Sequence, residues 1–207
     1  MNILAVMNLA LHRYFAIYKP YDMVSQFVSS HEVRLLGNLQ YAFPQGTHAI
    51  GRLDNHSEGL LLLTTNQQVT KLLFQGEKPH IRKYLVQVKN RMDILTAAQL
   101  SNGIPIEITG GETYVTTACE VELVARPTWL EPASYEIPAH LPHSWLEISL
   151  TEGKFHQVRK MVAAVHHKCR RLVRISIEEI SVENLKPGEV MELNEKEFFT
   201  KLHISYP

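Results

Sequence analysis

Residues 51–66 carry the sequence GRLDNHSEGLLLLTTN, in which a polar turn leads directly into a run of four leucines. Gly, Asn and Ser favour a turn, whereas a short apolar run bounded by turn residues is typical of a buried strand. The stretch therefore predicts that Asp54 lies at the lip of a buried strand. Such a turn would hold a reactive carboxylate on a rigid support, although an aspartate in a turn more often caps its own backbone.

Two further segments place charged and aromatic side chains beside apolar runs. Residues 152–161 read EGKFHQVRKM, a glycine followed by an amphipathic helix with adjacent cations, and residues 82–88 read RKYLVQV. Together with residues 51–59, and in this order, they resemble the ribosomal pseudouridine synthases of types A (small subunit) and B, E and F (large subunit). Residues 14–22, YFAIYKPYD, look like that family's opening strand and Lys-Pro turn. The resemblance thus covers nearly the whole chain from about residue 13.

Other positions favour the E-type subgroup of this family. These are residues 127–130 (PTWL), residues 143–150 (HSWLEISL) and Asp22, where many members have glycine. The family usually has Asn-Arg at the positions of Phe155 and His156, so a cation near the substrate backbone is replaced here by a histidine, whose charge depends on pH.

Length and composition are those of an ordinary globular protein. A chain of 207 residues can form one domain with a sizeable core, or two small lobes around a cleft. Cys119 and Cys169 provide neither a disulfide framework nor the spacing of a zinc site, which favours a reducing cytoplasm. Residues 1–12 are expected to form a tail, because they lack the features of a signal peptide and are too short to span a bilayer. No membrane attachment is expected.

Charge is distributed unevenly along a chain whose net charge is zero, with 21 basic and 21 acidic residues. Seven Lys and Arg and no acidic residue occur from Lys154 to Arg174, whereas seven glutamates occur between Ile177 and Glu197. A local basic surface can bind phosphates while the whole molecule stays neutral. The alternative interpretation is a solvated charged face.

The pattern of apolar residues indicates many strands and few helices. Strands are predicted at residues 14–18, 48–53, 60–64, 84–89, 114–124, 145–150 and 172–177. Helices are predicted at residues 67–74, 93–102 and 155–166, the last with Val158, Met161, Val162 and Val165 facing the core. Four prolines between residues 126 and 144 predict an irregular surface loop. The composition of elements indicates an α+β domain with a largely antiparallel sheet.

The resemblance adds expectations about fold and activity. It implies an extended, mostly antiparallel mixed sheet with the active-site cleft across its middle, in a catalytic domain of two lobes at residues 13–203. It implies the isomerisation of a uridine to pseudouridine in ribosomal RNA, with 23S RNA as the expected substrate and the protein as a monomer. Family members often carry an amino-terminal S4 RNA-binding module, which is expected to be absent because only about a dozen residues precede the catalytic domain.

The resemblance also assigns three catalytic residues. The family's GRLD aspartate is its nucleophile, a role that falls here to Asp54, and the sequence leaves open whether it attacks C1′ of the sugar or C6 of the base. Arg159 matches the family arginine that pairs with the aspartate, and a guanidinium offsets the desolvation of an ionised carboxylate. Tyr84 matches the family tyrosine that stacks on the target base, and it is a candidate to remove the C5 proton.

Five residues are expected to contact the substrate or to support the catalytic residues. Arg52 would contact a phosphate or fill the place of the displaced base, and a structural ion pair is its alternative role. Lys19 would contact a phosphate or buttress the Lys-Pro turn, and Leu172 matches an apolar family residue under the active site. Lys160 and His156 belong to the basic segment that would bind the RNA backbone.

Two other functions fit parts of the sequence. A hydrolase could use Asp54 and Glu58 as paired carboxylates, but the sequence does not fix their relative geometry. A catalytically silent RNA-binding or ribosome-assembly module would need only the basic segment, and the presence of Asp54, Tyr84 and Arg159 together argues against it.

No metal or cofactor is expected. His166, His167 and Cys169 lack a recognised ligand spacing with a complementary pair, and so do His140 and His143. The chain has no Gly-rich phosphate loop or dinucleotide fingerprint, and the isomerisation needs no cofactor.

Overall fold

A computed structural model describes residues 12–76 and 78–205 of the chain. The predicted tail, residues 1–12, therefore lies outside the described residues apart from His12. Within the described residues, nine strands form one sheet: β1 (Tyr14–Lys19), β2 (His48–Ile50), β3 (Glu58–Thr64), β4 (Arg82–Lys89), β7 (Glu120–Val124), β8 (His143–Leu150), β9 (Cys169–Ile177), β10 (Ile180–Ser181) and β11 (Val190–Leu193). A separate hairpin joins β5 (Pro105–Glu107) to β6 (Thr113–Val115).

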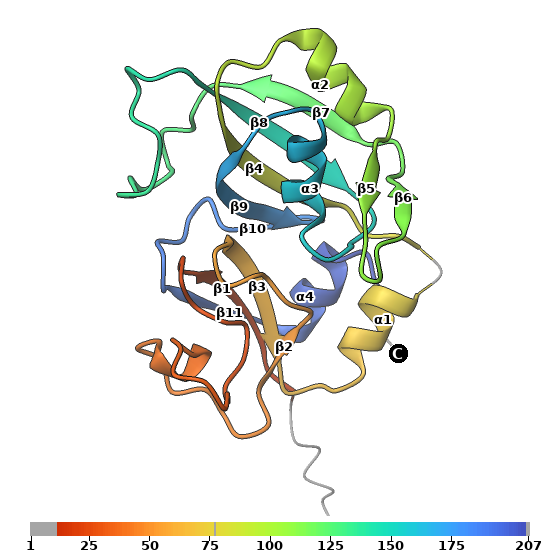
Figure 1. Ribbon diagram of the computed structural model, residues 1–207. Coiled ribbons are helices and arrows are strands. Elements are labelled where there is room, and N and C mark those ends of the chain that lie inside the picture. Colours follow the sequence, from red (N-terminus) through yellow and green to blue (C-terminus); the bar gives the residue numbers. More distant parts are fainter. Residues whose placement is uncertain (1–11, 77, 206–207) are drawn as a thin grey trace, which may run out of the picture.

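The strand order divides the main sheet into two halves. The order is β11-β1-β3-β9-β4-β8-β7, with β2 beside β3 and β10 beside β9 (Figure 1). Among the described strands, β3 and β9 form the single parallel pair, and they meet only at Glu58↔Val173 and Gly59↔Arg174. Gly59 has φ +98, a conformation that favours glycine. The sheet is therefore mixed and mostly antiparallel, as predicted, and it is narrowest where its halves join.

Helices cover the two halves separately. They are α1 (Val69–Gln75), α2 (Ile94–Ser101), α3 (Gln157–Ala164) and α4 (Glu195–Lys201), with a 3-10 turn at Leu36–Asn38. Figure 1 shows α2 and α3 with the half that contains β4 and β8, and α4 beside the half that contains β1 and β3. The helices nevertheless pack in different buried clusters: α4 contributes Phe198 and Phe199 to one that also reaches Leu85 on β4, and α3 contributes Met161 and Val162 to another.

The four-leucine run is buried on both faces of β3. Leu60 and Leu62 pack in the cluster that contains the α4 aromatics, whereas Leu61 and Leu63 pack in a second cluster on the opposite face. A strand that is covered on both sides reads as a continuous apolar run rather than as an alternation. Burial on both faces therefore explains why four leucines follow one another with no polar residue between them.

Two predicted elements differ from the structure. The strand predicted at residues 48–53 ends at Ile50, because Gly51 has φ +73 and begins the turn. The strand predicted at residues 114–124 is two short strands, β6 and β7, which belong to different sheets. Residues 126–142 form an irregular loop, as the prolines predicted.

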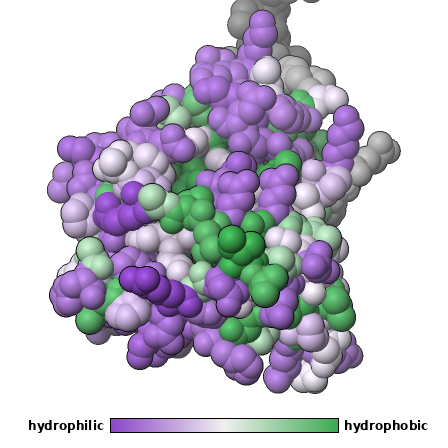
Figure 2. All heavy atoms as spheres, turned by 90° about the horizontal axis from the view of Figure 1, so that it is seen from above, coloured by the Kyte–Doolittle hydropathy of each residue, from purple (hydrophilic) through white to green (hydrophobic). Residues whose placement is uncertain are grey.

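The helix α2 exposes apolar side chains. Ile94 is 77% and Leu95 is 78% exposed. Figure 2 looks down on the end of the molecule where α2 lies and shows hydrophobic atoms gathered in the middle of a largely hydrophilic face. In the described part of the chain, the helices are too short and too polar to cross a membrane.

Candidate active site

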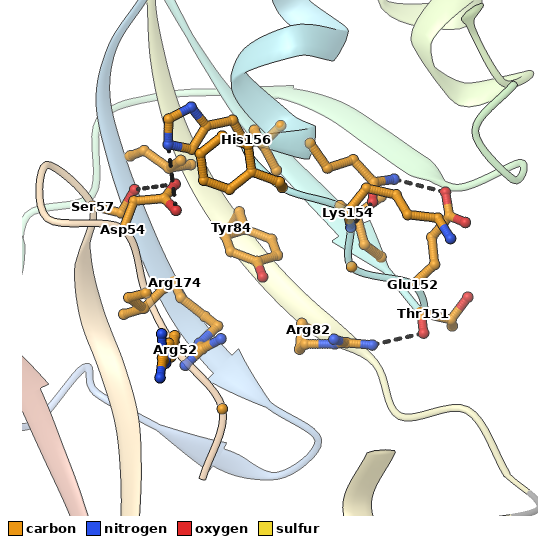
Figure 3. Close-up of a pocket in the computed structure, with 18 of the residues that line it drawn as sticks. Arg52, Asp54, Ser57, Arg82, Tyr84, Thr151, Glu152, Lys154, His156 and Arg174 are labelled. Atoms are coloured by element: carbon orange, nitrogen blue, oxygen red, sulfur yellow. Dashed lines mark hydrogen bonds and ion pairs between the residues drawn. The ribbon is translucent and has the colours of Figure 1, made fainter. Parts of the chain in front are cut away.

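A cleft of about 620 Å³ opens where the two halves of the sheet meet (Figure 3). One wall is the turn between β2 and β3, from Gly51 to Ser57, and the other is the segment from Leu150 to Val158 that leads into α3. The floor comes from the central strands, with Arg82 and Tyr84 on β4 and two side chains on β9. The sheet junction therefore brings four segments that are distant in the chain to one cavity.

Asp54 presents its carboxylate to this cleft. The side chain is 31% exposed, and its Oδ1 lies 3.6 Å from Nε2 of His156. The hydroxyl of Ser57 donates to Oδ2 at 3.5 Å, while the backbone N–H of Ser57 donates to the Asp54 carbonyl. Among the described residues, the carboxylate contacts side chains and caps no backbone N–H group. This geometry favours a chemical role over that of a turn cap.

Three side chains hold the backbone of the Asp54 turn. Ser25 Oγ donates to the carbonyl of Leu53 and accepts from its N–H, both at 2.9 Å. The Lys19 ammonium donates to the carbonyl of Asn55 at 3.3 Å, and also to two carbonyls of its own loop. Arg159 donates to the carbonyl of His56 at 2.7 Å. Because carbonyls on both sides of Asp54 are held, the carboxylate is positioned before any substrate binds.

Lys19 is fully buried beneath the turn. Burial lowers the pKa of its amine to about 7, against the opposing effect of the carboxylates of Glu58 and Asp54. Since its Nζ contacts backbone carbonyls rather than the cleft, Lys19 buttresses the turn. The other role considered for it, contact with a phosphate, is not compatible with this position.

Arg159 does not make the predicted pair with Asp54. Among the described residues, its guanidinium contacts the carbonyl of His56, the hydroxyl of Ser57 and the Cys169 sulfur. The Asp54 carboxylate lies on the side of the turn that faces His156. Arg159 therefore clamps the turn in this structure and reaches the carboxylate only indirectly, through the Ser57 hydroxyl that also contacts Asp54.

Tyr84 lies on the floor of the cleft, between cations. It is the register partner of Arg174 on β9, and the two strands shift register beside it, between Lys83 and Tyr84. Figure 3 shows its hydroxyl directed toward the side where Arg52, Arg82 and Arg174 lie. Leu172 also lines the cleft while packing in the core, as expected for an apolar residue under the site.

The arginines of the floor have unused hydrogen-bond donors. Arg174 is only 4% exposed, and its Nε donates to the carbonyl of Leu60 at 2.8 Å, but its Nη2 has no partner within the described part of the chain. Arg82 donates to the carbonyl of Thr151 at 2.7 Å, its Nε is likewise unpartnered there, and burial lowers its pKa. Buried donors without partners are costly. A ligand with several acceptor oxygens would satisfy them.

The sequence interpretation assigned no role to Arg82 and included Arg174 only as the last cation of the basic segment, although a signal for the cleft was present. Side chains two residues apart on a strand share a face. Arg82 precedes Tyr84 by two positions and Arg174 follows Leu172 by two. Both arginines could therefore have been placed in the cleft from the residues already chosen.

The predicted cations at the start of α3 lie at the rim. His156 lines the cleft, and its φ of +56 is unusual for a residue other than glycine. Phe155 also lines the cleft and stacks on His156, with ring centroids 3.9 Å apart and planes at 17°. The Lys160 ammonium lies 5.5 Å from the centroid of the Phe155 ring, so Lys160 is beside the rim rather than within the cleft.

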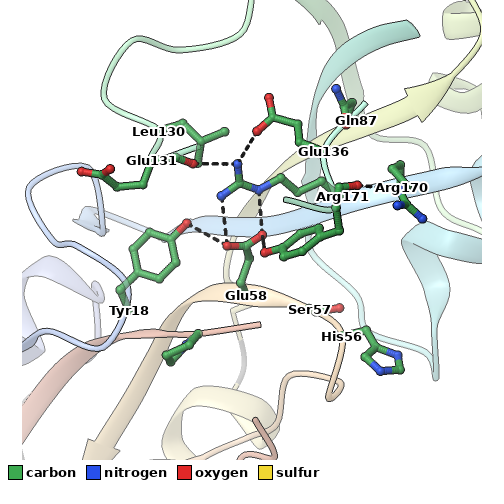
Figure 4. Close-up of polar contacts among 12 residues, drawn as sticks. Tyr18, His56, Ser57, Glu58, Gln87, Leu130, Glu131, Glu136, Arg170 and Arg171 are labelled. Carbon is green, nitrogen blue, oxygen red and sulfur yellow. Dashed lines mark hydrogen bonds and ion pairs between the residues drawn. The ribbon is translucent and has the colours of Figure 1, made fainter. Parts of the chain in front are cut away.

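Glu58 lies in a buried cluster, where its carboxylate contacts Arg171 and Tyr18 (Figure 4). It is 2% exposed, and Arg171 donates to both of its oxygens, at 2.7 and 3.1 Å. Tyr135 from the proline-rich loop donates to it at 2.8 Å, and Glu136 of the same loop accepts from Arg171 at 2.7 Å. The interpretation of Asp54 and Glu58 as paired acids across a substrate is therefore wrong.

The same cluster corrects the interpretation of the basic segment. Arg171 is buried and paired with two carboxylates, so it is not available to a phosphate.

Among the described residues, no group of three or more His, Cys, Asp or Glu is arranged to hold a metal ion.

Comparison with known proteins identifies the class to which this fold and cleft belong. The family model for RNA pseudouridylate synthase matches residues 13–164. The chain belongs to this family and is an RNA pseudouridine synthase, an isomerase. The predicted family, fold class and enzyme class are thereby confirmed.

Individual relatives show which members of the family this chain is similar to. The ribosomal large subunit pseudouridine synthase E of Vibrio parahaemolyticus is 33% identical over 176 residues, which cover 84% of this chain and 71% of that protein. The protein of the same name from Xanthomonas campestris is 32% identical over 171 residues, covering 83% and 90%. The ribosomal small subunit pseudouridine synthase A of Salmonella typhimurium is 29% identical over 186 residues, covering 89% and 72%.

A solved structure agrees with these matches. The crystal structure of a pseudouridylate synthase matches 92% of this chain and 74% of its own, with a TM-score of 0.73 and 25% identity. The fold built from the sheet junction is therefore that of a pseudouridylate synthase.

Proposed function

We propose that this protein isomerises a uridine of ribosomal RNA, in the 23S RNA of the large subunit, with Asp54 as the nucleophile. The observation that carries the proposal is the Asp54 carboxylate, held on a fixed turn in a cationic cleft that also contains Tyr84. The choice of ribosomal RNA is supported by the names of the relatives, several of which are ribosomal large subunit pseudouridine synthase E.

The reaction breaks the C1′–N1 bond, turns the base and joins its C5 to C1′. Asp54 attacks C1′ or C6 to form a covalent adduct, which collapses once the base has turned. The proton that leaves C5 is balanced by the proton that N1 gains, so no oxidant or reductant is required. Tyr84 stacks on the base, and its phenol oxygen, as the phenolate, accepts the C5 proton. Arg159 keeps the turn in place throughout.

The remaining cations bind the RNA. A uridine must leave its stack to reach Asp54, which costs a few kcal/mol that contacts in the cleft must offset. Arg52, Arg82 and Arg174 bind phosphate oxygens, which supply the acceptors that Arg82 and Arg174 lack. His156 lies between Asp54 and the rim, where it contacts the ribose-phosphate backbone.

All of these residues come from one chain, and we propose that residues 13–203 act as a single catalytic domain, as a monomer in the cytoplasm.

The test compares wild type with Asp54→Asn on uridine-containing ribosomal RNA fragments. Pseudouridine is mapped by carbodiimide modification and primer extension. We expect a new stop with wild type and none with Asp54→Asn. Asp22→Asn is the matched control, because Asp22 is an exposed carboxylate beside the turn but outside the cleft lining, and it should keep full activity.

Two results would contradict the proposal. A stop produced equally by Asp54→Asn would remove Asp54 as the nucleophile. RNA binding without any stop on fragments of either ribosomal RNA would instead favour a catalytically silent RNA-binding or ribosome-assembly module.

A further inference from the structure

Phe155 is a large apolar side chain that the fold leaves 63% exposed at the rim of the cleft. Its ring lies almost parallel to the ring of His156, with centroids 3.9 Å apart. His156 in turn contacts the Asp54 carboxylate (Figure 3). Carboxylate, imidazole and phenyl ring therefore form an ordered series that runs from one wall of the cleft to solvent.

The backbone at this point is held in an unfavourable conformation. His156 has φ +56 and ψ 27, and it begins α3 without a side-chain cap. A left-handed residue other than glycine persists only when its surroundings determine it, and such residues cluster at functional sites. Here the conformation places two consecutive aromatic rings face to face at the rim.

The charges around Phe155 suit a nucleic acid. Lys160 lies 5.5 Å from the ring centroid, and Lys154 lines the same cleft. Two carboxylates, Asp54 and Glu152, line the same cleft, and that of Glu152 already accepts hydrogen bonds from Tyr114, Thr117 and Gln157. An exposed aromatic ring with cations around it is the combination by which proteins bind single-stranded nucleic acid, because the base stacks and the phosphates meet the cations.

We propose that Phe155 stacks on the RNA base adjacent to the target uridine, so that His156, Phe155 and this base form one continuous stack. The target base itself must reach Asp54 and Tyr84, so the base on Phe155, one ring further out than His156, is a neighbour of the target. This inference rests on the proposed function in taking RNA as the ligand and in placing the target uridine at Asp54 and Tyr84. It makes Phe155 a positioning residue for the strand that flanks the reacting nucleotide.

The experiment measures binding and needs no turnover. Fluorescence anisotropy gives the affinity of wild type, Phe155→Leu and Phe155→Tyr for a ten-residue oligouridylate and for an abasic oligonucleotide of the same length. We expect Phe155→Leu to bind oligouridylate roughly 5- to 100-fold more weakly than wild type, and Phe155→Tyr to bind it as wild type does. The abasic oligonucleotide should bind equally to all three. Leu95→Ala, which removes an apolar side chain of similar exposure on α2, should have no effect.

Equal affinity of wild type and Phe155→Leu for oligouridylate would overturn the stacking role, as would failure of wild type to bind it. The same loss on the abasic oligonucleotide would also overturn it, because the effect would then not depend on the base. These outcomes are separate from the Asp54 test, which follows pseudouridine formation: loss of activity in Asp54→Asn neither requires nor excludes stacking on Phe155.

Discussion

Gly59 and Arg174 approach so closely that a Cβ atom on Gly59 would lie 2.3 Å from the carbonyl oxygen of Arg174. The two residues are register partners at the parallel junction of β3 and β9. The same contact brings the Arg174 side chain beside the turn that carries Asp54. The close contact between the halves of the sheet, and with it the geometry of the cleft, therefore requires a residue without a side chain at position 59.

Gly59→Ala should lower the free energy of unfolding by about 2 kcal/mol or more, because it adds a backbone clash to an unfavourable φ. Urea denaturation measures the change. Gly110→Ala is the matched control: Gly110 has φ +94, but an added Cβ would meet nothing within 4 Å. Equal losses in the two variants would show that the approach to Arg174 carries no cost of its own.

Arg159→Lys should lose most of the activity while the protein keeps its fold. One guanidinium nitrogen contacts the His56 carbonyl and the Ser57 hydroxyl while the other contacts the Cys169 sulfur, and a lysine lacks this rigid fork. Turnover and melting temperature are compared with those of Arg91→Lys, an exposed arginine outside the cleft lining. A lysine variant that remains active would exclude the clamp as a requirement for catalysis.

Tyr84→Phe separates the two roles assigned to Tyr84, because it keeps the ring and removes the hydroxyl. We expect RNA affinity close to that of wild type and a large loss of single-turnover rate. Tyr84→Leu should lose affinity as well, since stacking is worth roughly 1–3 kcal/mol per base. Near-normal turnover in Tyr84→Phe would remove the hydroxyl as the acceptor of the C5 proton.

Arg171→Met should destabilise the fold by about 3–5 kcal/mol, because it leaves the buried carboxylate of Glu58 without its cation, whereas Glu136 keeps its pair with Arg126. Chemical denaturation measures this loss. Lys201→Met provides the contrast, since Lys201 pairs with Glu197 on the surface of α4 and should cost less than about 1 kcal/mol. Similar small losses would show that the buried cluster adds no more stability than a surface pair.

Lys19 should give the folding equilibrium a distinctive pH dependence. Its pKa is lowered to about 7 in the folded protein, whereas the pKa of a lysine in an unfolded chain is about 10.4. Between these values the unfolded chain binds more protons, so the contribution of Lys19 to the free energy of unfolding increases as pH rises from 7 toward 10, by at most about 1.4 kcal/mol per pH unit.

The stability difference between wild type and Lys19→Met, measured from pH 6 to 9, isolates this contribution from other titrating groups. It should grow above about pH 7. Lys71→Met, which replaces an exposed lysine on α1, should leave the pH profile of wild type unchanged. Parallel profiles for wild type and Lys19→Met would contradict the lowered pKa.

Local sequence patterns predicted the elements around the site well. The strand β3 follows from a continuous apolar run. The core face of α3 follows from apolar residues spaced three or four positions apart. The elements β11 and α4 were not predicted, because β11 is only four residues long and its partner β1 lies far away in sequence. The sequence nevertheless contains an N-cap signal for α4, because the side chain of Asn194 accepts a hydrogen bond from the N–H of Glu197 at 2.9 Å.

The sequence predicted which residues lie in the site better than it predicted what those residues contact. Motif order placed Arg52, Asp54 and Tyr84 in one cleft, and the structure brings them together there. The target of Arg159 was not predictable, because it depends on the path of the turn and on which side of the backbone the carboxylate lies. The burial of Glu58 depends on a loop about 75 residues later, which no local pattern connects to it.

The order of the strands also determines when the enzyme can become active during its synthesis. Asp54 emerges early, but the arginine that clamps its turn follows 103 residues after His56, and Arg174 comes later still. The first strand, β1, pairs on one side with β11, where Tyr14 lies opposite Leu193. A nascent chain that ends before β9 therefore has the proposed nucleophile but no cleft, so catalytic competence appears only when translation has passed the last central strand.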